Sequence, residues 1–252
     1  RLARCGYPII TVGETGCAEQ DPEQWWTAVC QTLREVVQDA PAEELAALCV
    51  QGQGPSVVMA DERGKPLNNA ILWMDTRPCG ERDELSLRLG NQVSPFAHMP
   101  MVMWMARHRQ EAYAQARWFL AAWDFVAMRW CGQPAASDLA YFQPFPEKEV
   151  EASGLPHKLF PPVVEAGHPI AGLTAAAARA TGLPEGLPVI AGVHDGIATF
   201  IGAGLVEPGR SADVNGTSGG LALCWREPIK KPGIFSATWI HPGEYIVGGA
   251  MA

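Results

Sequence analysis

The chain has 252 residues, of which 48% are hydrophobic and 18% charged, so it can bury a large core and is not a disordered protein. Its formal net charge of -8 and its lack of any basic run argue against a nucleic-acid partner. No apolar stretch reaches the ~20 residues needed to cross a bilayer, so we expect no membrane-spanning helix.

The clearest predicted helix covers residues 21–39. Asp21 can cap it, Pro22 suits its first turn, and its apolar residues form a single stripe. The elements that follow are predicted from apolar periodicity and from Gly and Pro breaks. In chain order they are a strand (45–52), a hairpin (56–75), helices (81–90 and 99–110), a strand (116–122), a helix (123–132), a surface excursion (144–162), a helix (173–182) and a strand (187–192).

From Arg210 onward the pattern changes to short apolar runs separated by Gly and Pro, which predicts strands and hairpins. Alternating helices and strands followed by a β-rich stretch are typical of the α/β class with a mixed sheet. No internal repeat is present.

The seven cysteines indicate a reducing environment. They are odd in number, widely spaced and without a Cys-x-x-Cys pair, so they predict neither a disulfide framework nor a zinc site. We therefore expect a cytoplasmic protein. The cysteines are Cys5, Cys17, Cys30, Cys49, Cys79, Cys131 and Cys224.

Asp195 is the first candidate for chemistry, because it stands between an apolar strand and a helical pattern. One interpretation is a helix N-cap, since Asp is a preferred capping residue and the helix dipole stabilises its charge. The other is a carboxylate in a cleft at the carboxyl end of a strand, where small neighbours let a substrate approach. The two interpretations are compatible. The small neighbours are Gly192, Gly196 and Ala198.

The segment "NGTSGG", residues 215–220, is the second candidate. Its backbone N-H groups and two hydroxyls could hold an anion, as phosphate loops do, or it could be an ordinary hairpin turn. The same letters also fit a G-x-S-x-G nucleophile elbow with Ser218 as the nucleophile of a hydrolase. That alternative requires a helix directly after Ser218, and only Glu227 followed by His241 could complete its triad.

His194 and Asp195 could also be the metal-binding pair of a phosphohydrolase. The remaining histidines show no ligand spacing, so the residues predict no metal site, and His194 is expected to be a partly buried or cleft-lining imidazole. Those histidines are His98, His108, His157, His168 and His241.

Four segments, taken in order, resemble the FGGY family of carbohydrate kinases, which have an actin-like, ribonuclease H-like fold. They are "EQDPEQWW" (19–26), "GQGPSVVMADERGKPLNNAILWMDTR" (52–77), "GLPVIAGVHDGIATFIGAGLVEPG" (186–209) and "NGTSG" (215–219). Among members of the family, xylulose kinases are similar in layout.

The resemblance implies a role for each matching residue. Asp195 would be the general base that takes a proton from a sugar or polyol hydroxyl as the hydroxyl attacks the γ-phosphate of ATP, with Mg²⁺ bridging the phosphates. Gly216, Thr217, Ser218 and Gly219 would hold the phosphates. The substrate would be read by Gln53, Gly54, Pro55, Trp73, Asp75 and Gly196. Trp73 could equally be a core residue.

Some positions depart from the family pattern. Gly54, Pro55 and Gly196 stand where xylulose kinases have Met, His and Asn, and Met101 stands where the family usually has Lys. A polar site discriminates through the hydrogen bonds it offers, so we expect a substrate other than xylulose.

The resemblance also implies missing parts. An Asp-x-Gly-Thr phosphate motif would precede Arg1 and an adenosine-binding domain would follow Ala252, so we expect the fold to be incomplete at both ends and this chain alone to be inactive. Residues 1–207 would form the sugar-binding domain, and residues 208–252 the phosphate turn and first strands of the next domain. A homodimer is possible, and a non-catalytic, actin-like sugar sensor is the alternative function.

Overall fold

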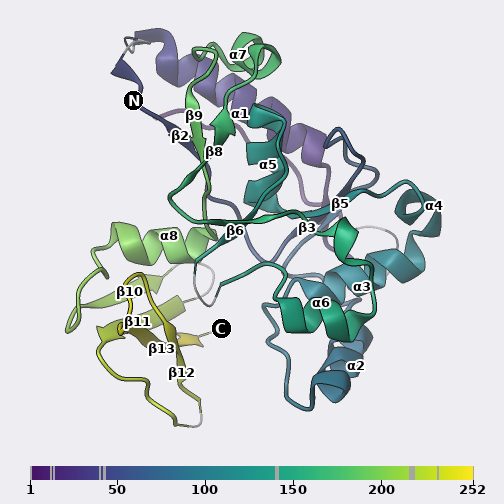
Figure 1. Cartoon of the computed structure of the whole chain (residues 1–252), viewed down its shortest axis with the longest axis vertical. Coiled ribbons are helices and arrows are strands. Elements are labelled where there is room, and N and C mark those ends of the chain that lie inside the picture. The colour runs from purple at the N-terminus through teal and green to yellow at the C-terminus, as the bar shows by residue number, and fades with distance from the viewer. Residues whose placement is uncertain are drawn as a thin grey trace.

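The computed structural model describes residues 2–11, 13, 15–39, 41, 44–139, 142–215, 219–231 and 233–251 (Figure 1). Its α-helices and strands cover most of the predicted elements. The helices are α1 (Pro22–Val36), α2 (Cys79–Leu89), α3 (Met99–His108), α4 (Gln110–Tyr113), α5 (Ala122–Cys131), α6 (Glu147–Ser153), α7 (Ala175–Thr181) and α8 (Asp195–Gly202).

The strands form four sheets that mix parallel and antiparallel pairing, which confirms the predicted α/β class. The first sheet has the order β1-β4-β3-β5, made of β1 (Glu19–Gln20), β3 (Val57–Ala60), β4 (Ala70–Ile71) and β5 (Trp118–Ala121). The second has the order β2-β9-β8, made of β2 (Leu48–Cys49), β8 (Pro169–Gly172) and β9 (Pro188–Ile190). A parallel pair joins β6 (Ala136–Asp138) to β7 (Val163–Glu165).

The fourth sheet is antiparallel and contains the last four strands, in the order β10-β11-β13-β12. It confirms the strands and hairpins predicted after Arg210. The strands are β10 (Ser211–Asn215), β11 (Gly219–Trp225), β12 (Phe235–Thr238) and β13 (Tyr245–Met251).

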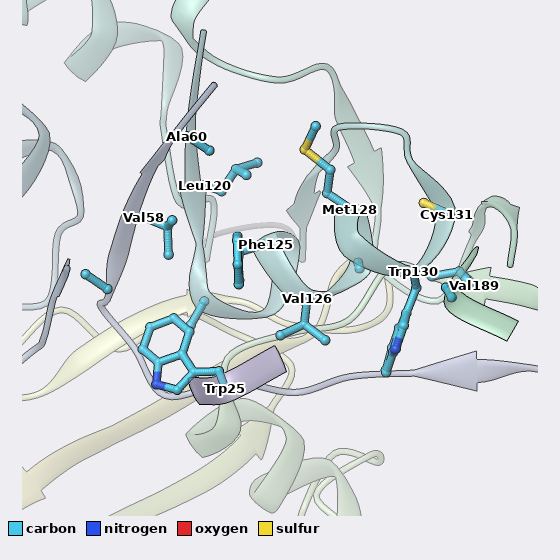
Figure 2. Packing of buried hydrophobic residues seen from close by; sticks show 14 of the residues in the cluster. Trp25, Val58, Ala60, Leu120, Phe125, Val126, Met128, Trp130, Cys131 and Val189 are labelled. Carbon is cyan, nitrogen blue, oxygen red and sulfur yellow. The ribbon is translucent and has the colours of Figure 1, made fainter. Parts of the chain in front are cut away.

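Helices cover both faces of the sheet that contains β3 and β5. Alternate side chains of a strand point to opposite faces, so Val58 and Leu120 pack with α1, α5 and α7, whereas Val57 and Phe119 pack with α2, α3 and α6. Figure 2 shows the first of these clusters, where Phe125 of α5 lies close to the strand residues Val58 and Leu120. Both strands are buried because each face has its own helical layer.

Several helix ends follow directly from the sequence. The Asp21 side chain caps α1 by accepting a hydrogen bond of 2.9 Å from the Glu23 N-H. α2, α5 and α7 each stop at a glycine with positive φ, a conformation that costs other residues more. The glycines are Gly90, Gly132 and Gly182.

The surface excursion predicted for residues 144–162 is wrong. This segment contains α6, and its Phe145, Val150 and Leu159 are buried in the cluster that α2 and α3 also form. The prolines were interpreted as loop signals, but Pro146 is the residue that precedes the first turn of α6, where a missing N-H has no cost. The predicted strand 45–52 is also shorter than expected, because the strand β2 contains Leu48 and Cys49, and Gly52 pairs farther along in an isolated bridge with His194.

α8 lies beside the last sheet (Figure 1). Its Ile197 is buried in a cluster with Leu205, Ala222, Trp239 and Ile246. The side chains of α8 therefore pack with the C-terminal strands, while the residues just before it contact the first part of the chain. None of the described helices is long and apolar enough to span a bilayer.

Asp124 is a buried carboxylic acid in the first turn of α5. Its Oδ1 accepts hydrogen bonds from the Ser137 N-H (3.1 Å) and Oγ-H (2.7 Å), and its Oδ2 has no hydrogen-bond partner among the described residues. Burial raises the pKa of Asp124 to about 7, and the two bonds from Ser137 oppose that shift only in part. The carboxyl group thus links α5 to β6, and its burial destabilises the fold more when the group is ionised than when it is protonated.

We expect Asp124→Asn to remove part of the pH dependence of stability. Between about pH 4 and pH 7 the folded protein holds a proton on Asp124 that the unfolded chain has lost, so wild-type stability falls as pH rises through this window. The predicted difference between the two stability-pH curves is on the order of 2–4 kcal/mol, measured by urea unfolding. The exposed Asp83→Asn is the control, and parallel curves for wild type and Asp124→Asn would contradict the prediction.

Candidate functional site

The candidate site lies where the chain after β2 runs beside the chain after β9. The two strands pair in parallel, with Leu48 opposite Val189, and the pairing continues beyond them. The Gly52 N-H donates to the Val193 carbonyl (3.3 Å), and the Asp195 N-H donates to the Gly52 carbonyl (2.8 Å). The carboxyl ends of adjacent parallel strands are a common place for ligands in α/β proteins.

Asp195 is the first residue of α8, and 58% of its side chain is exposed. Its Oδ1 accepts a hydrogen bond of 2.8 Å from the Gly196 N-H. The helix cap is His194, whose Nδ1 accepts from the same N-H at 3.0 Å. The N-cap interpretation of Asp195 is therefore wrong by one residue, because His194 has the non-helical backbone (φ -53°, ψ 137°) and the side-chain hydrogen bond of a cap. Asp195 keeps an accessible carboxylate at a positive helix end.

His194 joins α8 to the segment after β2. Its Nε2 lies 2.8 Å from the Gly54 carbonyl oxygen, and its ring meets the Trp123 ring edge-on at 6.1 Å between centroids. Its side chain is 29% exposed, as expected for a partly buried imidazole. The sequence predicts the partial burial of His194 but gives no sign of its contact with Gly54, which lies 140 positions away in the chain.

The glycines near Asp195 make room for the protein's own chain. A Cβ at Gly192 would lie 1.7 Å from the Val50 carbonyl oxygen, and a Cβ at Gly196 would lie 3.1 Å from two atoms of the His194 ring. Gly192 is therefore explained by the close packing of two strands and not by clearance for a substrate. Ala198 lies in the first two turns of α8.

The Gln53 side chain is hydrogen-bonded within the protein, whereas the Trp73 side chain is partly exposed. Gln53 Nε2 donates to Gln20 Oε1 (2.7 Å), which also accepts from Trp25 Nε1 (3.0 Å). Gln53 also lines a cavity of about 530 Å³ beside residues 3–7. Trp73 is 38% exposed, so it is not the core residue considered as its alternative. Pro55 is buried directly after Gly54.

The Asp75 carboxylate, predicted to contact the substrate, is bound by groups of the protein itself. Its side chain is completely buried and forms an ion pair with Arg77 (2.6 Å), while Oδ2 also accepts from the Ala18 N-H (2.9 Å). Arg77 also pairs with Glu19 at 2.6 Å. A buried carboxylate is stable only with such partners, and here they are supplied by the protein itself.

Comparison with known proteins decides the family. The model for the "FGGY family of carbohydrate kinases, N-terminal domain" matches residues 3–202. The chain belongs to this family. The xylulose kinase of Bacillus subtilis is 28% identical over 232 residues, which cover 84% of this chain and 46% of that protein. The xylulose kinase of Streptomyces rubiginosus is 30% identical over 266 residues, which cover 98% and 54%.

The crystal structure of xylulose kinase from Rhodospirillum rubrum has the same fold as this FGGY chain. It superposes with a TM-score of 0.83 and 27% identity, over 97% of this chain and 55% of that one. The resemblance read from the sequence and the actin-like fold class are confirmed. The chain spans about half the length of the curated relatives it matches.

The predicted phosphate turn of this FGGY chain falls mostly outside the described residues, since Gly216, Thr217 and Ser218 are not among them. Gly219 begins β11 and lies opposite Asn215 of β10. A strand, not a helix, therefore starts at the residue after Ser218, which contradicts the nucleophile-elbow alternative and its hydrolase function.

The next feature is the arrangement of metal-ligating side chains in the part of the chain that the structure describes. Within it, no group of three or more His, Cys, Asp or Glu side chains is placed to hold a metal ion. His194 and Asp195 therefore do not form a phosphohydrolase-type centre with other described residues.

Proposed function

We propose that the full-length protein phosphorylates a hydroxyl of a sugar or polyol with ATP and Mg²⁺, and that Asp195 is the general base. One observation carries this proposal. An exposed carboxylate stands at the N-terminus of α8, joined by backbone hydrogen bonds to the segment after β2, in a chain of a carbohydrate kinase family. The chain spans about half the length of the relatives it matches, so the activity is assigned to the full-length protein.

The chemistry requires a carboxylate that a hydroxyl group can reach. In the proposed step the acceptor oxygen bonds to the γ-phosphorus, the bond from that phosphorus to the ADP oxygen breaks, and the hydroxyl proton passes to Asp195. The Gly196 N-H holds one carboxylate oxygen at 2.8 Å and so orients the group without covering it. The phosphates are proposed to lie at Gly216, Thr217, Ser218 and Gly219.

We assign substrate recognition to the segment Gln53–Pro55, to Trp73 and to Gly196, and remove Asp75 from this set because its carboxylate is buried in an ion pair. Trp73 offers an exposed aromatic face of the kind that packs on sugar C-H groups. Gly54, Pro55 and Gly196 offer no side-chain hydrogen bonds, so the preferred acceptor is expected to differ from xylulose.

The test is a panel of acceptors with the full-length protein. Pentuloses, hexuloses, polyols and aldonates are incubated with ATP and Mg²⁺, and ADP release is measured against a reaction without acceptor. We expect acceptor-dependent turnover, with a kcat/KM for the best acceptor at least about tenfold above that for xylulose. The 252-residue chain assayed in parallel is expected to show no turnover.

The outcomes of the panel separate the proposals. If xylulose is the best acceptor, the assigned specificity is wrong and the kinase activity stands. If a sugar binds in calorimetry but no acceptor releases ADP, the protein is a non-catalytic sugar sensor and the proposed activity is wrong.

A further inference from the structure

The segment after β2 packs against the aromatic side chains of Trp123 and His194. A Cβ at Gly52 would lie 2.9 Å from the Trp123 backbone nitrogen, and a Cβ at Gly54 would lie 3.1 Å from the Trp123 ring. The same Cβ would lie 2.4 Å from His194 Cδ2, so the rings of Trp123 and His194 both border the side-chain space of Gly54. Trp123 belongs to α5 and is 2% exposed, so this segment packs against a buried side chain.

His194 bonds to both of the segments that the proposed reaction needs. Its Nε2 meets the Gly54 carbonyl at 2.8 Å, on the substrate segment, and its Nδ1 meets the Gly196 N-H at 3.0 Å, beside Asp195. A carbonyl only accepts and an N-H only donates, so both bonds form together in the neutral imidazole with its proton on Nε2.

The His194 ring and the glycine at position 54 depend on one another. At 2.4 Å from the ring, a side chain at position 54 would displace either the imidazole or the backbone. A Cβ at Gly196 would lie 3.1 Å from two atoms of the same His194 ring. Two of the positions that depart from xylulose kinases, Gly54 and Gly196, thus border a single side chain.

We propose that His194 is a positioning residue that sets the distance between the substrate segment and Asp195, and that Gly54 is glycine because the His194 ring occupies its side-chain space. The expected effect of His194 on catalysis rests on the proposed function. Its effect on the packing of the two segments rests on the geometry alone. His194 acts through Gly54 and Gly196 and not by touching the acceptor.

Two substitutions separate its two hydrogen bonds. In His194→Asn, the side-chain oxygen can still accept from the Gly196 N-H and cap α8, but the side chain is too short for the Gly54 carbonyl. In His194→Gln, the longer amide can donate to that carbonyl. We expect His194→Asn to raise the KM for the best acceptor about tenfold with kcat and the KM for ATP within about threefold, and His194→Gln to restore most of the loss.

The pairing of positions 54 and 194 is tested by a double-mutant cycle. Gly54→Ala is expected to raise the acceptor KM about tenfold in the wild-type background but less than about threefold in the His194→Asn background, because the clash is already relieved. His168→Asn, at a side chain that is 62% exposed, is the matched control and should leave every constant unchanged.

Hydrogen exchange of the full-length protein tests the positioning role without any turnover. Peptides that cover residues 50–56 and 190–197 should exchange at least about fivefold faster in His194→Asn than in wild type, with an unchanged melting temperature, and near the wild-type rate in His194→Gln. Wild-type exchange in His194→Asn, or additive effects in the cycle, would overturn the inference. A wild-type protein that phosphorylates no acceptor but shows this exchange pattern would refute the proposed function and leave the positioning role standing.

Discussion

Asp195→Asn in the full-length protein is expected to lower kcat by at least about 1,000-fold, because the amide cannot take the proton of the acceptor hydroxyl. The fold should persist, since His194 and not Asp195 caps α8, and the Asn oxygen can still accept from the Gly196 N-H. The acceptor should still bind, because binding does not require proton transfer. Steady-state ADP release and calorimetry with the best acceptor are the measurements.

The control for this variant is Asp83→Asn, which makes the same chemical change on an exposed face of α2 and should keep wild-type kcat. Turnover within about tenfold of wild type in Asp195→Asn would remove Asp195 from the role of general base. A large fall in melting temperature would show that the carboxylate serves the fold instead.

Arg77→Leu is expected to destabilise the protein by about 3–5 kcal/mol, because it removes the arginine that pairs with the buried carboxylate of Asp75 and one of the two arginines that pair with Glu19. Arg77 lies 2.6 Å from both Asp75 and Glu19, and its guanidinium stacks 4.3 Å from the centre of the Trp104 ring. Burial works against the charge of Glu19, but hydrogen bonds from Arg77, Asn69 and Arg109 keep its pKa below the usual value. Removing Arg77 takes away the largest of the interactions that oppose the effect of burial on Glu19.

Urea unfolding measures the effect of Arg77→Leu, with the exposed Arg63→Leu as control. Arg77→Lys should fall between wild type and Arg77→Leu, since an ammonium group keeps the charge but cannot bind both oxygens of Asp75 in the planar manner of a guanidinium. A loss below about 1 kcal/mol for Arg77→Leu would mean that this network behaves like a surface ion pair.

The same network shows a role for Asp75 that its position in the sequence did not reveal. Asp75 follows an apolar strand, as a ligand-binding carboxylate often does, and no sequence pattern distinguishes the two cases. Its partner Ala18 is 57 residues away in the chain, and Ala18 and Glu19, which shares Arg77 with Asp75, come close because β1 pairs with β4. Long-range pairing therefore decides whether a carboxylate at a strand end serves the ligand or the core.

Local chemistry determined much of this protein from the sequence alone. The Asp21 cap, the glycines that end α2, α5 and α7, and the strand-to-helix junction at Asp195 each depend on neighbours within a few residues. For the same reason the α/β class and the family resemblance could be read before any coordinates existed. These features depend on residues close together in the sequence, so residue propensities and motif spacing are enough to predict them.

Only the tertiary structure decided which groups meet at the site. The His194 ring reaches the Gly54 carbonyl across 140 positions, and Gly192 is a glycine because Val50 passes within van der Waals distance. The burial of Phe145 and Val150 likewise required α2 and α3 to be in place. Steric fit and hydrogen bonding between distant segments arise from the packed fold, and one sequence does not encode them in any local pattern.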